Sequence, residues 1–192
     1  PNPRLDKVLE GVNLVREHGV SLILAVGGGS VIDCAKFISL GSGLGEDEDL
    51  WDDYVETGKP APENLVPLVV VLTIAAAGSE MSNSSVITKE DGGIKRGYSN
   101  DLARAKFAVM DPELTLTLPD YQTACGCVDI LMHTMERYFV SGNRMQLTDG
   151  IAEALMRTVI RNARILRDDP QNGDARAEIM WAGALSHNGL TG

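Results

Sequence analysis

The stretch "LILAVGGGSVIDCAKFISL", residues 22–40, constrains the fold most, because an apolar run passes through three consecutive glycines directly into a helical pattern. The apolar run lacks clean alternation, which is typical of a strand buried on both faces. A helix is expected from near Ser30. Such a junction presents backbone N–H groups at the positive end of a helix dipole, where an anion can approach closely. The stretch therefore predicts a phosphate site at Gly27, Gly28 and Gly29.

The glycine run has a second explanation. Ser30 and Asp33 form an S-x-x-D pattern that resembles a capping box, which any helix can use. The contiguous glycines also differ from the G-x-G-x-x-G fingerprint of dinucleotide-binding folds. A cap needs one or two flexible residues and this turn has three, which favours phosphate binding, but the stretch alone leaves both interpretations open.

Strands and helices alternate around this junction. Apolar spacings of three and four predict an amphipathic helix over residues 5–18. Residues 65–72 predict a second buried strand, in which Pro67 confines the pairing to the residues after it. Residues 89–98 contain Asp-Gly-Gly between two strand-like pieces and predict a hairpin, and residues 106–110 predict another short strand. The fold class expected is α/β, with helices packed on a parallel sheet.

The character of the chain changes near residue 117. Beyond it, three helical segments and no strand candidates are expected, at about residues 119–140, 147–167 and 174–187. We therefore predict two domains, an α/β domain over residues 1–117 and an all-helical domain over residues 118–192.

Composition narrows the function classes. The chain has 17 Lys and Arg against 27 Asp and Glu, with a formal net charge of −10, which argues against a nucleic-acid partner. No segment approaches the roughly 18–20 apolar residues of a membrane span, and the first residues lack signal-peptide features. We expect a soluble, cytoplasmic protein without a membrane partner. The three cysteines predict no disulfide framework, and we interpret all three as small core residues.

A second block, "LTIAAAGSEMSNSSVIT" at residues 72–88, is rich in small and hydroxylated side chains. Hydroxyls such as those of Thr73 and Ser82 can hydrogen-bond a polar ligand, and the small residues from Ala75 to Gly78 leave room for a flat ring. Clusters of Ser and Asn more often form turns. Composition alone favours the turn interpretation.

A third block, "CGCVDILMHTMERYF", places Asp129 and His133 four residues apart on a predicted helix. Their side chains then share one face about one turn apart, a spacing that can chelate a divalent metal. The alternative is that they form the water-facing side of an amphipathic helix. Ile130, Met132 and Val140 extend the apolar surface, so we expect burial most of the way round, where an aspartate and a histidine need a partner or a metal.

Together with "AVGGGSVIDCAKFI" and "FAVMDPELTLTLP", the second and third blocks closely resemble the iron-containing (group III) alcohol dehydrogenases, in their NAD(P)H-dependent butanol dehydrogenase branch. The order and separation of the blocks also match. The resemblance implies a dehydroquinate synthase-like fold, with a parallel-sheet dinucleotide-binding domain, an all-helical metal-binding domain and a site between them. It also implies that the chain is a fragment, incomplete at both ends.

The resemblance assigns roles to individual residues. It implies that the cofactor is bound by Gly27, Gly28, Gly29, Ser30, Asp33, Thr73, Ser82, Val86 and Lys95. It makes Asp129 and His133 the first two of four metal ligands, and the family's other two are histidines beyond Gly192. His187 is not counted, because its segment precedes the family's third ligand.

The implied chemistry is hydride transfer between NAD or NADP and a small primary alcohol or aldehyde. A divalent metal, iron or alternatively zinc, acts as Lewis acid, and no catalytic residue is expected beyond the metal ligands. A homo-oligomer is expected. Ala77 stands where the family usually has threonine, which removes a hydroxyl from the cofactor pocket. Two other interpretations are a non-catalytic nucleotide-binding fragment with an incomplete metal site, and a polyol dehydrogenase relative.

Overall fold

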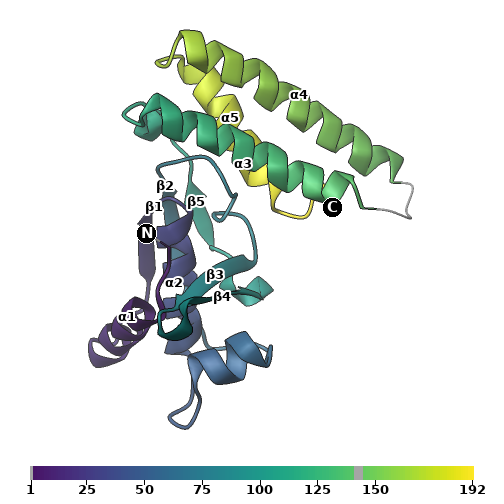
Figure 1. Cartoon of the computed structure of the whole chain (residues 1–192). Coiled ribbons are helices and arrows are strands. Elements are labelled where there is room, and N and C mark those ends of the chain that lie inside the picture. Colours follow the sequence, from purple (N-terminus) through teal and green to yellow (C-terminus); the bar gives the residue numbers. More distant parts are fainter. Residues whose placement is uncertain (1, 141–144) are drawn as a thin grey trace. The chain divides into compact units, whose positions relative to one another are not determined.

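The computed structural model describes residues 2–140 and 145–192. The chain divides into two compact units (Figure 1). The first contains the described residues of Pro1–Val71 together with Asn83–Ala108, and the second contains Leu72–Ser82 together with the described residues of Val109–Gly192. The predicted division after residue 117 assigns Leu72–Ser82 to the first domain, whereas in the structure this segment packs with the helices. The domain assignment itself stays a prediction.

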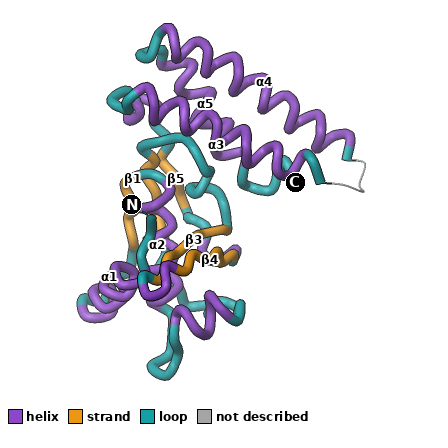
Figure 2. Tube along the Cα trace, viewed as in Figure 1, coloured by secondary structure: helices purple, strands orange, loops and turns teal. Residues whose placement is uncertain are grey.

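The first unit is built around the predicted strand–glycine–helix junction. Helix α1 (Leu5–Glu17) precedes strand β1 (Ile23–Gly27), which leads into helix α2 (Gly29–Ser42). Among the described residues, β1 joins β2 (Leu68–Leu72) and β5 (Phe107–Val109) in a parallel sheet of order β1-β2-β5. Figure 2 draws the strands in orange. The predicted α/β class with a parallel sheet is confirmed, and Pro67 directly precedes β2 as expected.

The prediction that β1 is buried on both faces is wrong. Ala25 is 2 % exposed, but Leu24 and Val26 are 58 % and 55 % exposed. Successive side chains of a strand point to opposite faces of the sheet. Because α2 packs against β1 from the face of Ala25, the side chains of its two neighbours remain on the uncovered face.

The predicted hairpin is present. Strands β3 (Ser84–Lys89) and β4 (Ile94–Ser99) pair antiparallel, from Ser84 opposite Ser99 to Lys89 opposite Ile94. Gly92 and Gly93 form the turn with φ angles of +79° and +62°, a region that glycine adopts without steric cost. The hairpin packs against α2 through Ile87 and Tyr98.

One element of the first unit was not predicted. Leu50–Glu56, in an acidic stretch for which the sequence predicted no element, forms a seven-residue π-helix. The Asp49 side chain accepts hydrogen bonds from the backbone of Trp51 and Asp52 and so caps its start. The aromatic side chains of Trp51 and Tyr54 are 3 % and 1 % exposed, so this segment supplies part of the core of the unit.

The second unit consists mainly of three helices, which correspond to the three predicted segments. These are α3 (Asp120–Tyr138), α4 (Gln146–Asp168) and α5 (Gly173–Ser186), and each packs against the other two. A short 3₁₀ turn at Pro112–Thr115 precedes them, and two others, Asp91–Gly93 and Asp101–Ala103, belong to the first unit. The core of the helical unit is formed by Cys127, Ile130, Leu155, Val159, Leu166, Ala175, Ile179 and Ala182.

The prediction that α3 is buried most of the way round is wrong. Its buried residues, Gly126, Cys127, Ile130 and Thr134, lie on one side of the helix, because α4 and α5 both pack there. Val128, Met132 and Val140 are 57 %, 54 % and 58 % exposed. No helix in the described ranges is long and apolar enough to span a membrane.

The cysteines do not all lie in the core. Cys127 is buried and Cys34 is partly buried, but Cys125 is exposed. Cys125 and Cys127 are two residues apart on α3, so they point to different sides of the helix and only the second faces α4 and α5. The prediction of three core cysteines is therefore wrong for Cys125.

Candidate functional site

The glycine turn of the first unit connects β1 to α2 without a capping box. Gly27 ends β1, Gly28 is the N-cap residue and α2 begins at Gly29. Ser30 is therefore already inside the helix, and the N-cap residue has no side chain that could bond the first N–H groups. Gly28, Gly29 and Ser30 are partly or fully exposed. The turn thus offers backbone donors at a helix N-terminus, an arrangement that suits a phosphate.

Gly27 has a separate reason to be glycine. A Cβ atom added to it would lie 2.7 Å from Cγ2 of Val31, so a side chain there would overlap α2. Gly27 is also buried. Its role in the turn is therefore explained by the close packing of strand against helix, whereas Gly28 and Gly29 lie where a ligand has access.

The predicted cofactor residue Asp33 makes a structural hydrogen bond. Its Oδ2 accepts a hydrogen bond of 3.0 Å from the backbone N–H of Val86 on β3. The structure thereby joins two of the predicted cofactor residues, one on α2 and one on the hairpin. Lys95, another predicted cofactor residue, lies on β4 opposite Thr88, and its side chain is exposed.

Sequence reasoning missed Lys36 in the same region. Its side chain is 1 % exposed, and its Nζ donates a 2.8 Å hydrogen bond to the carbonyl oxygen of Ser84. The signal was present in the sequence, because Lys36 lies between Ala35 and Phe37 on the apolar face of the predicted helix. A charged residue at such a position needs a buried partner.

Thr73 and Ser82, which were also predicted to bind the cofactor, belong to the helical unit. Thr73 is half-buried and Ser82 is 1 % exposed. Between them the chain turns at Gly78, where the carbonyl oxygen accepts hydrogen bonds from Met81 at 3.1 Å and Ser82 at 3.0 Å. The block therefore does form turns, as its Ser and Asn content indicated.

The predicted metal ligands share one face of α3. Oδ1 of Asp129 lies 3.8 Å from Nε2 of His133, and their side chains are 45 % and 24 % exposed. Ligand atoms bound to one metal at 2.0–2.2 Å lie roughly 3 Å apart, so a small rotation of either side chain would let both bind the same ion. In the part of the chain that the structure describes, no group of three or more His, Cys, Asp and Glu is arranged to hold a metal. The pair therefore fits a metal as part of a larger ligand set.

His187 lies beside this pair without completing it. The centroids of the His133 and His187 rings are 4.7 Å apart, and the ring planes differ by 34°. Nδ1 of His187 lies 2.8 Å from the carbonyl oxygen of Ala77. Both contacts lie within the helical unit.

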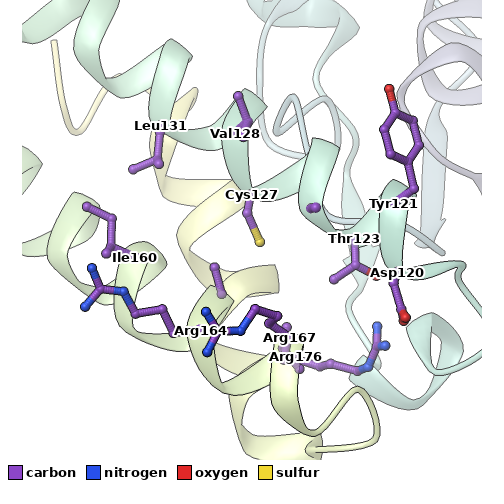
Figure 3. Close-up of a pocket in the computed structure, with 13 residues that line it drawn as sticks. Asp120, Tyr121, Thr123, Cys127, Val128, Leu131, Ile160, Arg164, Arg167 and Arg176 are labelled. Atoms are coloured by element: carbon purple, nitrogen blue, oxygen red, sulfur yellow. The ribbon is translucent and has the colours of Figure 1, made fainter.

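A hollow of about 570 Å³ lies elsewhere in the helical unit (Figure 3). Apolar side chains such as Cys127, Leu131 and Ile160 line it, together with Arg164 and Arg167. It contains none of the predicted site residues. Burial raises the pKa of the Cys127 thiol, which favours its protonated form. The hollow therefore does not contain the metal-ligand pair that the predicted chemistry needs.

Comparison with protein families gives two matches. The model described as "Iron-containing alcohol dehydrogenase" matches residues 1–112, and the model described as "Fe-containing alcohol dehydrogenase family, C-terminal" matches residues 123–191.

Individual relatives cover the whole chain. NADH-dependent butanol dehydrogenase A of Clostridium acetobutylicum is 42 % identical over 190 residues, which is 99 % of this chain and 48 % of that protein. NADPH-dependent aldehyde reductase YqhD of Escherichia coli is 38 % identical over 192 residues, which is 100 % of this chain and 49 % of that protein. The chain thus spans about half the length of the curated relatives it matches.

Solved structures agree with the sequence matches. The crystal structure of NADH-dependent butanol dehydrogenase A from Thermotoga maritima superimposes with a TM-score of 0.92 at 37 % identity, covering 100 % of this chain and 47 % of the other. Sulfoacetaldehyde reductase from Bifidobacterium kashiwanohense, in complex with NAD⁺, gives a TM-score of 0.87 at 29 % identity, covering 100 % and 49 %.

Proposed function

The chain belongs to the iron-containing alcohol dehydrogenase family, and from this premise we propose that its protein interconverts primary alcohols and aldehydes by NAD(P)-dependent hydride transfer at a divalent metal. The observation that carries the proposal is the Asp129–His133 pair, whose ligand atoms lie 3.8 Å apart on one face of α3. These are the positions that the family resemblance assigned to metal ligands. We further propose a cytoplasmic homo-oligomer.

The proposed cofactor residues act mainly through backbone groups. The N–H groups of Gly28, Gly29 and Ser30 at the start of α2 suit the pyrophosphate of a dinucleotide, because a helix N-terminus attracts negative charge. Relatives named for NADH and for NADPH are both similar to this chain, so the proposal includes either coenzyme. The full proposed set is Gly27, Gly28, Gly29, Ser30, Asp33, Thr73, Ser82, Val86 and Lys95.

Within this set, one hydrogen bond of Asp33 supports a positioning role for it. Its carboxylate is bonded to the backbone of Val86, and this bond fixes β3 against α2. Val86 and the adjoining β4, which carries Lys95, are thereby held at a fixed distance from the glycine turn. We propose that Asp33 contributes to cofactor binding by positioning the hairpin.

The proposed metal ligands are Asp129 through a carboxylate oxygen and His133 through Nε2. When bound, a divalent metal supplies Lewis-acid polarisation of the aldehyde oxygen. The chain's own residues contribute one negative charge and one neutral nitrogen donor, a set suited to iron or zinc. Two ligands do not hold a catalytic metal alone, so the site needs ligands from outside the described residues.

We propose residues 1–117 as the dinucleotide-binding domain and residues 118–192 as the metal-binding domain.

A second candidate function is nucleotide binding without catalysis. One observation favours it: the described residues supply only two proposed metal ligands, and they contain no group of three or more that could hold a metal. A polyol dehydrogenase is a third candidate within the same fold, and its range of substrates separates it from the first.

The test measures three properties of the protein: binding of NADH and NADPH by fluorescence, binding of Co²⁺ or Zn²⁺ by calorimetry, and reduction of butanal and of a polyol-derived ketone. We expect Asp129→Ala and His133→Ala to lose metal binding and to keep coenzyme binding. Asp120→Ala, also on α3 but nine residues from Asp129, is the matched control and should bind metal normally. Coenzyme binding without metal binding or aldehyde reduction would favour the second candidate.

A further inference from the structure

We propose that His187 is a positioning residue that fixes the ring of the metal ligand His133. This inference rests on the proposed function, because it requires Asp129 and His133 to bind a metal. His187 follows α5 directly as its C-cap residue and is half-buried. Among the described residues, it is not itself grouped with the two ligands as a third donor.

The hydrogen bond of His187 defines its orientation. Nδ1 lies 2.8 Å from the carbonyl oxygen of Ala77, and a carbonyl oxygen can only accept a hydrogen bond. Nδ1 therefore carries a proton and donates it to Ala77. A ring held in this way has a fixed plane, and it presents one face to a neighbouring side chain.

The acceptor of this hydrogen bond is itself fixed. Gly78, directly after Ala77, has a φ angle of +67°, and a Cβ atom there would lie 2.6 Å from the carbonyl oxygen of Gly183 on α5. A Cβ atom on Gly126 of α3 would lie 2.2 Å from the carbonyl oxygen of Ala75. The segment Leu72–Ser82 thus lies directly on both helices, so the Ala77 carbonyl cannot shift without moving them.

The ring of His133 lies between two neighbours. The Asp129 carboxylate lies 3.8 Å from its Nε2, and the ring of His187 contacts it in a tilted arrangement, with centroids 4.7 Å apart and ring planes 34° apart. This ring contact restricts rotation about the χ2 bond of His133, whose Nε2 lies toward Asp129. Residues that orient a metal ligand in this way raise metal affinity, and their removal typically weakens it about 10- to 100-fold.

Three substitutions separate the parts of this arrangement. His187→Ala removes both the ring and the hydrogen bond, His187→Asn keeps a donor for the Ala77 carbonyl but removes the ring, and His187→Phe keeps a ring without the donor. The measurement is the dissociation constant of Co²⁺ by calorimetry on each folded variant of the whole protein, which also contains the remaining metal ligands, with the absorption spectrum of bound Co²⁺ as a second readout. We expect affinity to fall about 10-fold in the Ala and Asn variants and about 3-fold in the Phe variant.

His18→Ala is the matched control, since His18 is an exposed histidine in the other unit and its loss should leave Co²⁺ affinity unchanged. Thermal unfolding of each variant separates loss of fold from loss of affinity, and the Asn and Phe variants keep the test open if the Ala variant does not fold. Equal affinities in all His187 variants and the unaltered chain, together with loss of binding in Asp129→Ala, would overturn this inference alone. Unchanged Co²⁺ binding in the Asp129→Ala and His133→Ala variants of the whole protein, or no Co²⁺ binding by the unaltered whole protein, would overturn the metal-ligand proposal and this inference with it.

Discussion

The carboxylate of Asp33 accepts a 3.0 Å hydrogen bond from the backbone N–H of Val86, which joins two segments 53 residues apart in sequence. Because the bond lies just beyond the glycine turn, it determines how the hairpin is held against α2. The sequence left open whether Ser30 and Asp33 form a capping box. They do not, and the bond to Val86 explains the aspartate at position 33 instead.

This bond predicts different effects for two substitutions of Asp33. Asp33→Ala removes the acceptor and leaves a partly buried N–H group unpaired, which should lower the free energy of unfolding by about 1–3 kcal/mol. Asp33→Asn keeps an acceptor oxygen and should cost less. Urea unfolding measures the difference, and hydrogen exchange at the Val86 amide should accelerate mainly in the Ala variant. Asp47→Ala, at an exposed position, is the control, and equal losses in both Asp33 variants would contradict the assignment.

Two helical glycines predict opposite effects of the same substitution. Gly126→Ala would place a Cβ atom 2.2 Å from the Ala75 carbonyl oxygen, so α3 and the Leu72–Ser82 segment must separate. Overpacking of this kind costs about 1–3 kcal/mol or more. Gly150→Ala, in α4, meets nothing within 4 Å and should stabilise the protein by about 0.5–1 kcal/mol, because alanine favours the helix. Thermal unfolding of both variants checks the pair, and stabilisation by Gly126→Ala would contradict the close approach.

The hydrogen bonds of Glu48 predict that the free energy of unfolding falls in acid. Hydrogen bonds from Lys59, the Gly45 backbone and the Tyr54 hydroxyl lower the pKa of its carboxyl from 4.5 to about 2. Because the folded pKa is below the unfolded one, its contribution is complete above pH 4.5 and is lost as the pH falls toward 2. Urea unfolding of the unaltered protein and of Glu48→Gln should therefore differ above about pH 5 and converge near about pH 2. A constant difference across this range would show that the carboxylate charge is not responsible.

Substitution of Ala77 by threonine is expected to raise coenzyme affinity. The family resemblance implies a threonine at this position, and one added hydrogen bond contributes about 0.5–1.5 kcal/mol. Ala77→Thr should therefore tighten NADH binding by about 2- to 10-fold, as measured by fluorescence titration. Ala77→Val has the same shape without the hydroxyl and should give no gain. A similar gain in both variants would assign the effect to packing.

Much of the fold was predictable because local patterns and packing agree. The spacing of Val8, Val12 and Val15 predicts α1, and these three residues are buried in it. β2 begins directly after Pro67, which lacks a backbone donor, although the Pro67 carbonyl oxygen still accepts a 2.9 Å hydrogen bond from the Ile23 N–H. The family resemblance, based on four blocks in order, is confirmed by the family matches.

The errors arise where tertiary packing decides. Val128 and Met132 look like core residues by composition, yet they lie on the side of α3 that α4 and α5 leave uncovered. The π-helix at Leu50–Glu56 has an acidic sequence whose aromatic residues become buried only through contacts with α1, α2 and the hairpin. The contact of His133 with His187 joins residues 54 positions apart, and no spacing rule connects them. The site residues themselves remain predictions.

The membership of Leu72–Ser82 in the helical unit affects how the chain can be divided. The chain passes between the units after Val71, after Ser82 and after Ala108, so no single cleavage separates them. A helical unit cut free at residue 117 would lack the Ala75 and Ala77 carbonyls, which contact α3 and the end of α5. Protein fragments or split reporters based on this chain must therefore carry both segments of the helical unit.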